Sequence, residues 1–264
     1  MDKILGLPEL ASKHGTDVDR FIIYIHYLMI ALFVGWSAYF LYTLWRFRRS
    51  RHPKADYVGV TSHASSYLEL AVAAVEVLLL VGFAIPLWAR VVDQGDLKEL
   101  IEKKQVQVIR VTAQQFSWGG RYPGPDGIFG KQDISLVSPA NKLGLWQLDD
   151  KLKIQDLDGK DDVVLADNVE IVAPLGKDII ISLSSLDVIH SFKVPAMRMT
   201  HDAIPGMRIP VHFLPTKTGT FQINCAQLCG VGHSSMKGLF KVVPQSEFDA
   251  WLKSKAGSAP VNFE

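Results

Sequence analysis

The sequence predicts an α+β chain in which a transmembrane helical hairpin precedes a β-sandwich. Residues 21–45 contain no Asp, Glu, Lys or Arg, and residues 68–89 contain only the charged side chains Glu69 and Glu76. From residue 106 onward, short β-rich runs alternate with Gly, Pro, Asn and Asp. This spacing, without long amphipathic helices between the runs, is typical of two packed sheets.

Each apolar run is long enough to cross a bilayer, which takes about 20 apolar residues. We place transmembrane helices at residues 21–47 and 67–92. The loop between them, residues 48–66, continues a basic cluster that begins at Arg46, and such clusters remain cytoplasmic. The N-terminal segment, residues 1–20, and the whole β-rich part therefore lie outside. A cleaved signal peptide is excluded by the mostly polar residues 1–20. The alternative to a membrane hairpin is a pair of buried helices in a soluble protein.

The β-rich part is predicted to span residues 105–245, followed by a helix and tail over residues 246–264. Ser246 is the predicted helix cap, and Phe248, Trp251 and Leu252 share one face of the helix. The runs that predict strands are residues 106–112, 169–173, 179–183, 209–214 and 238–243.

Residues 122–168 are rich in Gly, Pro and Asp and are expected to form an insertion with limited structure. Its acidic run, residues 156–162, lacks the ligand spacing and terminal Glu of a calcium loop, so a solvated acidic loop is preferred over a calcium site. Across the chain, 28 basic residues balance 27 acidic ones, which argues against a nucleic acid partner.

The only two cysteines lie in one short motif, C-x-x-x-C-x-x-x-H-x-x-M, formed by Cys225, Cys229, His233 and Met236. Thiolate, imidazole and thioether together favour copper or another thiophilic metal. A single blue-copper site uses one Cys and two His, so the second Cys suggests two bridged coppers, with His190 as the second imidazole. The backbone carbonyl of Gln227 is the candidate oxygen ligand. Such a centre would relay single electrons.

Two alternatives compete with the copper centre. Zinc takes Cys2His2 ligands, but structural zinc sites seldom include Met and usually have more closely spaced cysteines. A disulfide between Cys225 and Cys229 suits a domain outside the cytoplasm, although the spacing of His233 and Met236 after the second Cys argues against it.

These motifs, together with Asp187-Val188-Ile189-His190-Ser191-Phe192 and Asp202-Ala203-Ile204-Pro205-Gly206-Met207, resemble the binuclear copper (CuA) domain of cytochrome c oxidase subunit II. The resemblance implies a cupredoxin-like sandwich on a two-helix anchor. It implies electron transfer from cytochrome c, or from a complex that carries one, to haem in subunit I. There oxygen is reduced at haem and CuB, and protons are pumped. The implied location is a bacterial inner membrane, with both termini and the copper domain on the periplasmic side. The implied copper ligands are His190, Cys225, Gln227, Cys229, His233 and Met236.

Two departures from the family lie near the predicted copper ligands. Many relatives have a magnesium-binding Glu at the position of Gln227; Gln keeps the carbonyl but not the charge, which argues against magnesium. Many relatives also have Gln-Trp-x-Trp where this chain reads Gln-Phe-Ser-Trp, so Phe116 stands at the usual electron-entry tryptophan and Trp118 matches the second one.

Further roles follow from the same resemblance. Glu69 matches a carboxylate at the mouth of a proton path into subunit I, with a simple interfacial anchor as its alternative. Asp187 and Asp202 are candidates for an acidic docking face, with loop capping as the alternative.

Three other protein classes compete with the oxidase subunit: a metal-free quinol oxidase subunit, a nitrous oxide reductase and a membrane-tethered copper chaperone. Six histidines fit no ligand spacing and are expected to be structural: His14, His26, His52, His63, His201 and His212.

Overall fold

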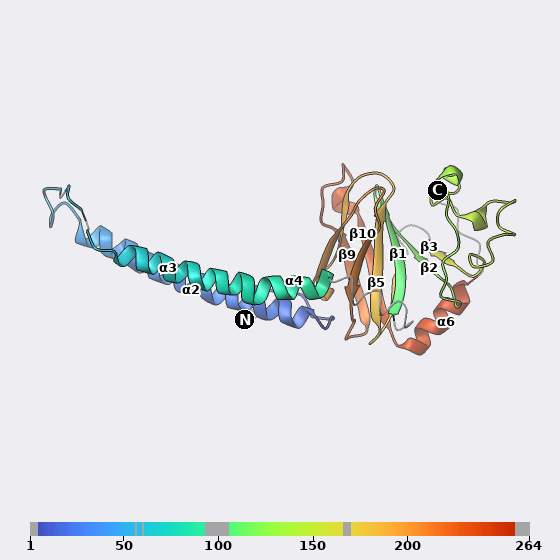
Figure 1. The fold of residues 1–264 in the computed structure, drawn as a ribbon, viewed down its shortest axis with the longest axis horizontal. Coiled ribbons are helices and arrows are strands. Elements are labelled where there is room, and N and C mark those ends of the chain that lie inside the picture. The colour runs from blue at the N-terminus through green and yellow to red at the C-terminus, as the bar shows by residue number, and fades with distance from the viewer. Residues whose placement is uncertain (1–4, 56, 60, 93–105, 166–169, 257–264) are drawn as a thin grey trace. The chain divides into compact units, whose positions relative to one another are not determined.

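The computed structural model, drawn in Figure 1, describes residues 5–55, 57–59, 61–92, 106–165 and 170–256. The chain forms two compact units. We call residues 17–90 the helical hairpin, and residues 7–16 together with the described residues after 105 the β domain. Several predicted positions lie outside the described residues: 105, 166–169 and the tail after 256.

Two long apolar helical segments form the hairpin. The first is α2 (Gly15–Arg46), and the second consists of α3 (Ala64–Leu79), a π-helical turn η1 (Leu80–Ala84) and α4 (Ile85–Val92). Both segments are long and apolar enough to cross a membrane. Their most apolar stretches contain no buried residue, unlike the core helices of a soluble protein. Tyr24 and Phe83 join the two segments, with ring centroids 5.7 Å apart.

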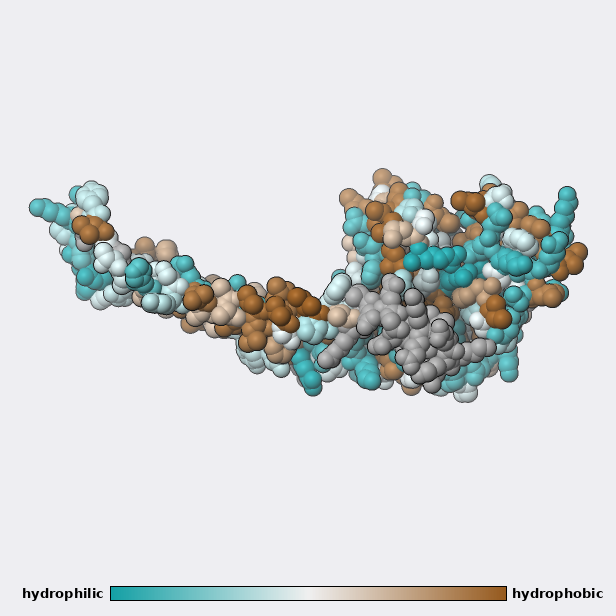
Figure 2. Space-filling model, in the orientation of Figure 1, coloured by the Kyte–Doolittle hydropathy of each residue, from teal (hydrophilic) through white to brown (hydrophobic). Residues whose placement is uncertain are grey.

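Side-chain chemistry changes along the hairpin as a bilayer requires. Figure 2 shows apolar residues along its middle and hydrophilic ones around the loop that joins the helices. Near this loop the cations cover aromatic rings, and the guanidinium of Arg51 lies 4.0 Å from the ring centroid of Trp45. Aromatic rings beside cations are typical of a membrane–water interface.

The first helix begins at Gly15, six residues before the predicted span, and the residues just before it pack on the β domain. Ala11 is fully buried and donates its backbone N–H to Ala196 O at 2.8 Å. The Ser12 hydroxyl donates to Met197 O at 2.7 Å, and Lys13 N–H donates to a carbonyl just after β8. Much of the N-terminal segment is therefore part of the domain. Its short polar sequence carries no strand pattern that could have predicted this.

The β domain is a sandwich of two five-stranded sheets. The first has the order β3-β2-β1-β5-β8 and the second β4-β10-β9-β6-β7. Parallel pairing joins β1 to β5 and β4 to β10, and the other neighbours are antiparallel. The strands of the first sheet are β1 (Val106–Gln114), β2 (Ser117–Tyr122), β3 (Val163–Leu165), β5 (Asp178–Ser185) and β8 (Ile209–Phe213). Those of the second are β4 (Ile171–Pro174), β6 (His190–Val194), β7 (Met199–Ala203), β9 (Gly219–Cys225) and β10 (Lys237–Val243).

Alternating burial along the strands builds the core between the sheets. In β1 every second residue, from Gln107 to Ala113, is buried, as the two-residue period of a strand dictates. Aromatic pairs cross from sheet to sheet: Phe213 meets Phe240 at 5.6 Å, and Trp118 meets Phe192 at 5.1 Å between ring centroids. These contacts fix the spacing of the two sheets.

The C-terminal helix α6 (Gln245–Lys255) buries the predicted face, because Phe248 and Leu252 are buried and Trp251 packs against the core. The predicted cap at Ser246 is wrong: the helix starts after Pro244, whose missing N–H costs nothing at this position. The rings of Phe248 and Trp251 lie against Tyr122, which closes one end of the sandwich.

The insertion has more structure than its composition indicates. It contains two short 3-10 turns, η2 (Ile134–Leu136) and η3 (Trp146–Leu148), as well as strand β3. Its acidic run is only partly solvated: Asp158 is exposed, whereas Asp156 is only 1% exposed and Asp162 2%. Asp162 forms a buried ion pair with Arg121 of β2, and the Asp156 carboxylate accepts the Lys131 N–H at 3.1 Å. Asp162 therefore anchors the insertion to the sheet, and Asp156 ties two parts of the insertion together.

Candidate metal centre

Two segments of the second sheet carry all the predicted ligands. His190 is the first residue of β6. Cys225 is the last residue of β9, and the loop to β10 supplies Cys229, the 3-10 turn η5 (His233–Ser235) and Met236. Because β6 and β9 are paired, with Phe192 opposite Cys225, the start of one strand lies beside the end of the other.

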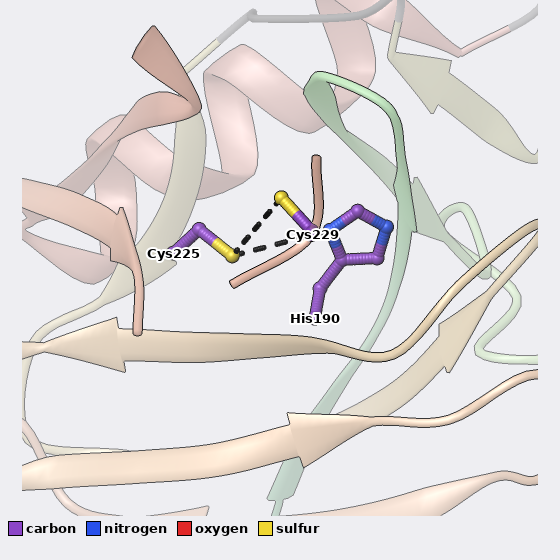
Figure 3. Close-up of side chains that lie close together, drawn as sticks. All are labelled: His190, Cys225 and Cys229. Carbon is purple, nitrogen blue, oxygen red and sulfur yellow. Dashed lines mark hydrogen bonds between the residues drawn. The ribbon is translucent and has the colours of Figure 1, made fainter. Parts of the chain in front are cut away.

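The ligand atoms converge on one point, and Figure 3 shows the thiol of Cys225 facing Cys229 and His190. The two sulfurs are 3.8 Å apart. Nδ1 of His190 lies 3.9 Å from the Cys225 sulfur, and Nδ1 of His233 lies 3.6 Å from that of Cys229. The Met236 sulfur lies 3.8 Å from Cys229, and the Gln227 carbonyl oxygen lies 3.1 Å from the Cys225 sulfur.

These separations fit a shared metal better than a disulfide. A disulfide needs sulfurs about 2.05 Å apart, and both cysteines are free. A metal holds thiolates at about 2.3 Å and imidazole nitrogens at about 2.0 Å. On one tetrahedral ion, two thiolates are then about 3.8 Å apart, and a thiolate and an imidazole about 3.5 Å. The observed spacings therefore match the donor set of a thiolate and imidazole metal site.

The site is largely shielded from water. His190 is fully buried, Met236 is 1% exposed and Cys229 is 5% exposed. Burial, together with the neighbouring thiol of Cys225, raises the pKa of Cys229 to about 11. A thiolate in this position is therefore costly until a cation neutralises it, and a bound metal supplies that charge.

Asp187 orients the imidazole of His190. Its carboxylate lies 2.8 Å from His190 Nε2, which leaves Nδ1 facing the cysteines. Burial opposes ionisation of Asp187, but hydrogen bonds from His190 and from the backbone N–H groups of Gln115 and Val188 outweigh it and lower the pKa of this carboxyl. A carboxylate that holds the second nitrogen of a ligating histidine is a common feature of metal sites.

The turn between β1 and β2 supports the ligand loop from the other sheet. The amide of Gln115 donates to the Cys229 carbonyl at 2.6 Å. The ring of Phe116 lies so close to the loop that a Cβ added at Gly232 would meet it at 2.4 Å. The sequence motif predicted neither contact, because Gln115 and Phe116 lie far from the ligand loop in the chain and neither is a metal-ligand type.

The aromatic residues predicted for electron entry lie on different sides of the site. Trp118 is 1% exposed and its ring centroid is 6.2 Å from that of His190, in an edge-to-face arrangement. Phe116 is only partly buried and lies over the loop beside Gly230 and Gly232. Trp118 is therefore an internal neighbour of a ligand, and Phe116 is the more accessible ring.

An apolar surface surrounds the ligand loop. Leu228 and Val231 are 76% and 103% exposed, and Val188 and Ile189 are 38% and 45% exposed. All four residues line a shallow depression over the loop, together with Cys229. Of the two residues predicted for an acidic docking face, Asp202 is exposed on β7. Asp187 instead contacts His190.

The remaining predicted residues lie outside the metal centre. Glu69 and Glu76 are both on α3 and exposed in the hairpin. Seven residues apart, they share one side of the helix. Of the non-ligand histidines, His212 of β8 pairs with Asp178 at 2.8 Å, and His26 contacts the carbonyl of Ile22 in its own helix.

Comparison with known proteins shows which family the chain resembles. A family model described as cytochrome c oxidase subunit II, periplasmic domain, matches residues 147–243, which include every predicted ligand. Cytochrome c oxidase subunit 2 of Cereibacter sphaeroides is 28% identical over 258 residues, covering 96% of this chain and 80% of that protein. The chain is similar to subunit II of cytochrome c oxidases over nearly its whole length. Members of that family normally bind copper, so the six converging donors are candidate copper ligands.

Other relatives match a shorter part of the chain. The alternative cytochrome c oxidase subunit 2 of Bradyrhizobium diazoefficiens is 37% identical over 147 residues, which is 56% of this chain and 50% of that protein. The crystal structure of the periplasmic domain of subunit II of the Bradyrhizobium japonicum cytochrome oxidase shares 28% identity, covers 56% of this chain and 92% of that chain, and has a TM-score of 0.40.

Proposed function

We propose that this subunit II accepts single electrons from cytochrome c at a binuclear copper centre and passes them to haem in subunit I. Oxygen reduction to water and proton pumping then take place in the assembled oxidase. The observation that carries this proposal is the convergence of two free thiols, 3.8 Å apart, with two imidazoles and a thioether. Two coppers held by these thiolates and imidazoles would supply a one-electron store whose charge is spread over both metals.

The protein's own residues keep this centre suited to electron transfer. His190, Cys229 and Met236 are almost entirely shielded from water, and the hydrogen bond to Asp187 fixes the ring of His190. The donors come from the start of β6, the end of β9 and one loop that is hydrogen-bonded to Gln115. They are therefore held in place before metal binds. A rigid, dry set of ligands limits the reorganisation that accompanies a change in charge.

We place the donor on the apolar surface over the ligand loop, formed by Val188, Ile189, Leu228 and Val231. Phe116 lies beside this loop and is our candidate for electron entry, with Trp118 behind His190 as the internal neighbour. Transient redox partners use small interfaces, and an apolar patch suits the exposed haem edge of a cytochrome c. In the assembled oxidase, Val231→Glu should slow oxidation of reduced cytochrome c by about tenfold with copper content unchanged. An unchanged rate would remove this surface from the proposal.

The membrane assignments complete the proposal. The basic loop after Arg46 favours a cytoplasmic position, which puts both termini and the β domain on the periplasmic side of a bacterial inner membrane. Glu69 and Glu76 on one side of α3 are costly in lipid. We therefore infer that this side faces subunit I, where Glu69 would serve the proton path. Gln227 offers its carbonyl near Cys225 without a carboxylate, which argues against magnesium.

The test is low-temperature electron paramagnetic resonance with copper quantitation. It requires the full chain in detergent, because residues 7–16 are part of the β domain. Two coppers per chain and a seven-line mixed-valence signal are expected. Cys229→Ser should abolish the signal. The control His212→Ala, which changes a histidine on the other sheet, should retain it. A single copper, bound zinc or a disulfide in the wild-type chain would refute the proposal.

A further inference from the structure

A cavity of about 240 Å³ lies on the outer side of the first sheet, far in sequence from the ligand loop. Strands β1 and β5 form its floor, and residues 132–143 of the insertion form its wall. Four cations line it: Arg110, Arg121, Lys142 and Arg208. The hydroxyl residues Thr112, Ser182 and Ser184 line it as well.

Strand geometry places these residues together. Arg110 and Thr112 are alternate residues of β1, so their side chains leave the sheet on the face opposite the core. The parallel register sets Arg110 beside Ser182 and Thr112 beside Ser184 of β5. On the other side of β1, Arg110 is the direct partner of Arg121 in β2. Like charges directly opposite one another destabilise a sheet unless something compensates them.

Within the described residues, hydrogen-bond acceptors only partly compensate the charges of these arginines. Asp162 accepts from Nε and Nη2 of Arg121, but the buried Nη1 of Arg121 has no hydrogen-bond partner among the residues that the structure describes. Arg110 and Arg208 both donate to the single oxygen Oε1 of Gln132, at 3.1 and 2.6 Å. A buried guanidinium nitrogen without an acceptor is costly, and Oδ1 of the paired Asp162 carboxylate also has no partner among the described residues.

The electrostatic field of the cavity is positive. Among the described residues, the carboxylates near these cations are Asp162, which is paired with Arg121, Asp133, which accepts from the backbone and hydroxyl of Ser135, and Asp156, which accepts the Lys131 N–H. Burial, followed by repulsion from Arg208 and Arg121, lowers the pKa of Arg110 to about 10. An anion in the cavity would relieve this repulsion.

We propose that this cavity binds a phosphate-class oxyanion. Guanidinium forks, an ammonium group and hydroxyls approaching from three strands and the insertion offer more donors than the two oxygens of a carboxylate can accept. The volume is below the range of about 300–1,000 Å³ that is usual for larger ligands, so the ligand is inorganic phosphate or a single phosphate group on a small carrier. The insertion thereby gains a role, because it supplies Gln132 and Lys142 to the cavity.

The test is isothermal titration calorimetry of the full chain in detergent, with inorganic phosphate at constant ionic strength. Saturable binding of one phosphate per chain is expected. The net charge of +1 makes general attraction of anions weak. Arg208→Gln should weaken binding by about tenfold or more, because it removes a charged donor from an exposed position where folding is not at risk. The control Lys253→Gln makes the same charge change on the exposed side of α6 and should leave the affinity unchanged.

A second titrant, glycerol 3-phosphate, separates the sources of the ligand. Tighter binding of glycerol 3-phosphate than of phosphate would support a lipid headgroup, and the reverse order would support free phosphate. The proposal would be overturned if neither compound bound the wild-type chain, or if Arg208→Gln and Lys253→Gln bound phosphate equally well.

Discussion

Replacing Asp187 tests whether the metal centre depends on a residue that touches no metal. Its carboxylate accepts from His190 Nε2 at 2.8 Å, from Gln115 N–H at 2.6 Å and from Val188 N–H at 2.7 Å. Asp187→Ala leaves the Nε2 atom of a fully buried ring without a partner. A hydrogen bond to a charged group is worth about 1.5–3 kcal/mol, and about 1.4 kcal/mol is a tenfold change in affinity. We therefore expect copper binding to weaken by roughly 10- to 100-fold, in line with other such carboxylate–histidine pairs.

The assay is competition for copper between the purified full chain and a chelator of known affinity, followed by the visible absorption of the thiolate–copper bonds. Asp202→Ala is the matched control, because Asp202 is exposed on β7 and also flanks a ligand segment. A conservative variant, Asp187→Asn, keeps one acceptor oxygen and should lose less affinity than Asp187→Ala. Equal copper affinities for the Asp187→Ala and Asp202→Ala variants would show that His190 needs no orienting partner.

Three further predictions concern packing and buried polar groups. Gly232→Ala should lower the copper content, because its Cβ would meet the Phe116 ring at 2.4 Å. Adding Phe116→Ala should restore the copper content. Metal analysis that finds no rescue would contradict this prediction. Tyr122→Phe removes the hydroxyl that bonds both the N–H and the C=O of one residue in β4 and should cost about 1–3 kcal/mol in urea unfolding. Arg121→Met leaves Asp162 buried without its cation and should cost about 3–5 kcal/mol, whereas the double variant with Asp162→Leu should regain most of that stability.

Much of the fold could be predicted because its signals are local. Charge-free runs identify the hairpin, and the β-branched run from residue 179 marks the centre of β5. Strands with weaker signals were not predicted: β2 is Ser-Trp-Gly-Gly-Arg-Tyr, and its two glycines argue against a strand. It forms because Trp118 and Tyr122 are buried against the core. Tertiary burial overrides propensity in such segments, and no local pattern records it.

The metal centre likewise has ligands that the sequence predicts and supporting residues that it does not. The four loop side chains are close in sequence, so their spacing predicts them, and the need of two coppers for a second imidazole points to His190. The residues that hold the ligands in place, Gln115 and Asp187, come from the turn after β1 and the loop after β5. Their contacts depend on how the chain crosses between strands, and a motif carries no information about that. The same holds for the cation-lined cavity, whose arginines come from β1, β2 and the segment just before β8.

The geometry ties the metal centre to both sheets of the sandwich. The ligands belong to the second sheet, whereas Gln115, Phe116 and Trp118 belong to the first. Trp118 contacts both His190 and Phe192, so a shift of one sheet against the other would move the ring beside a ligand. Packed interiors do not deform gradually. The position of the ligand loop is therefore set by the core between the sheets, and cavity-forming changes there should alter the copper spectrum before they unfold the domain.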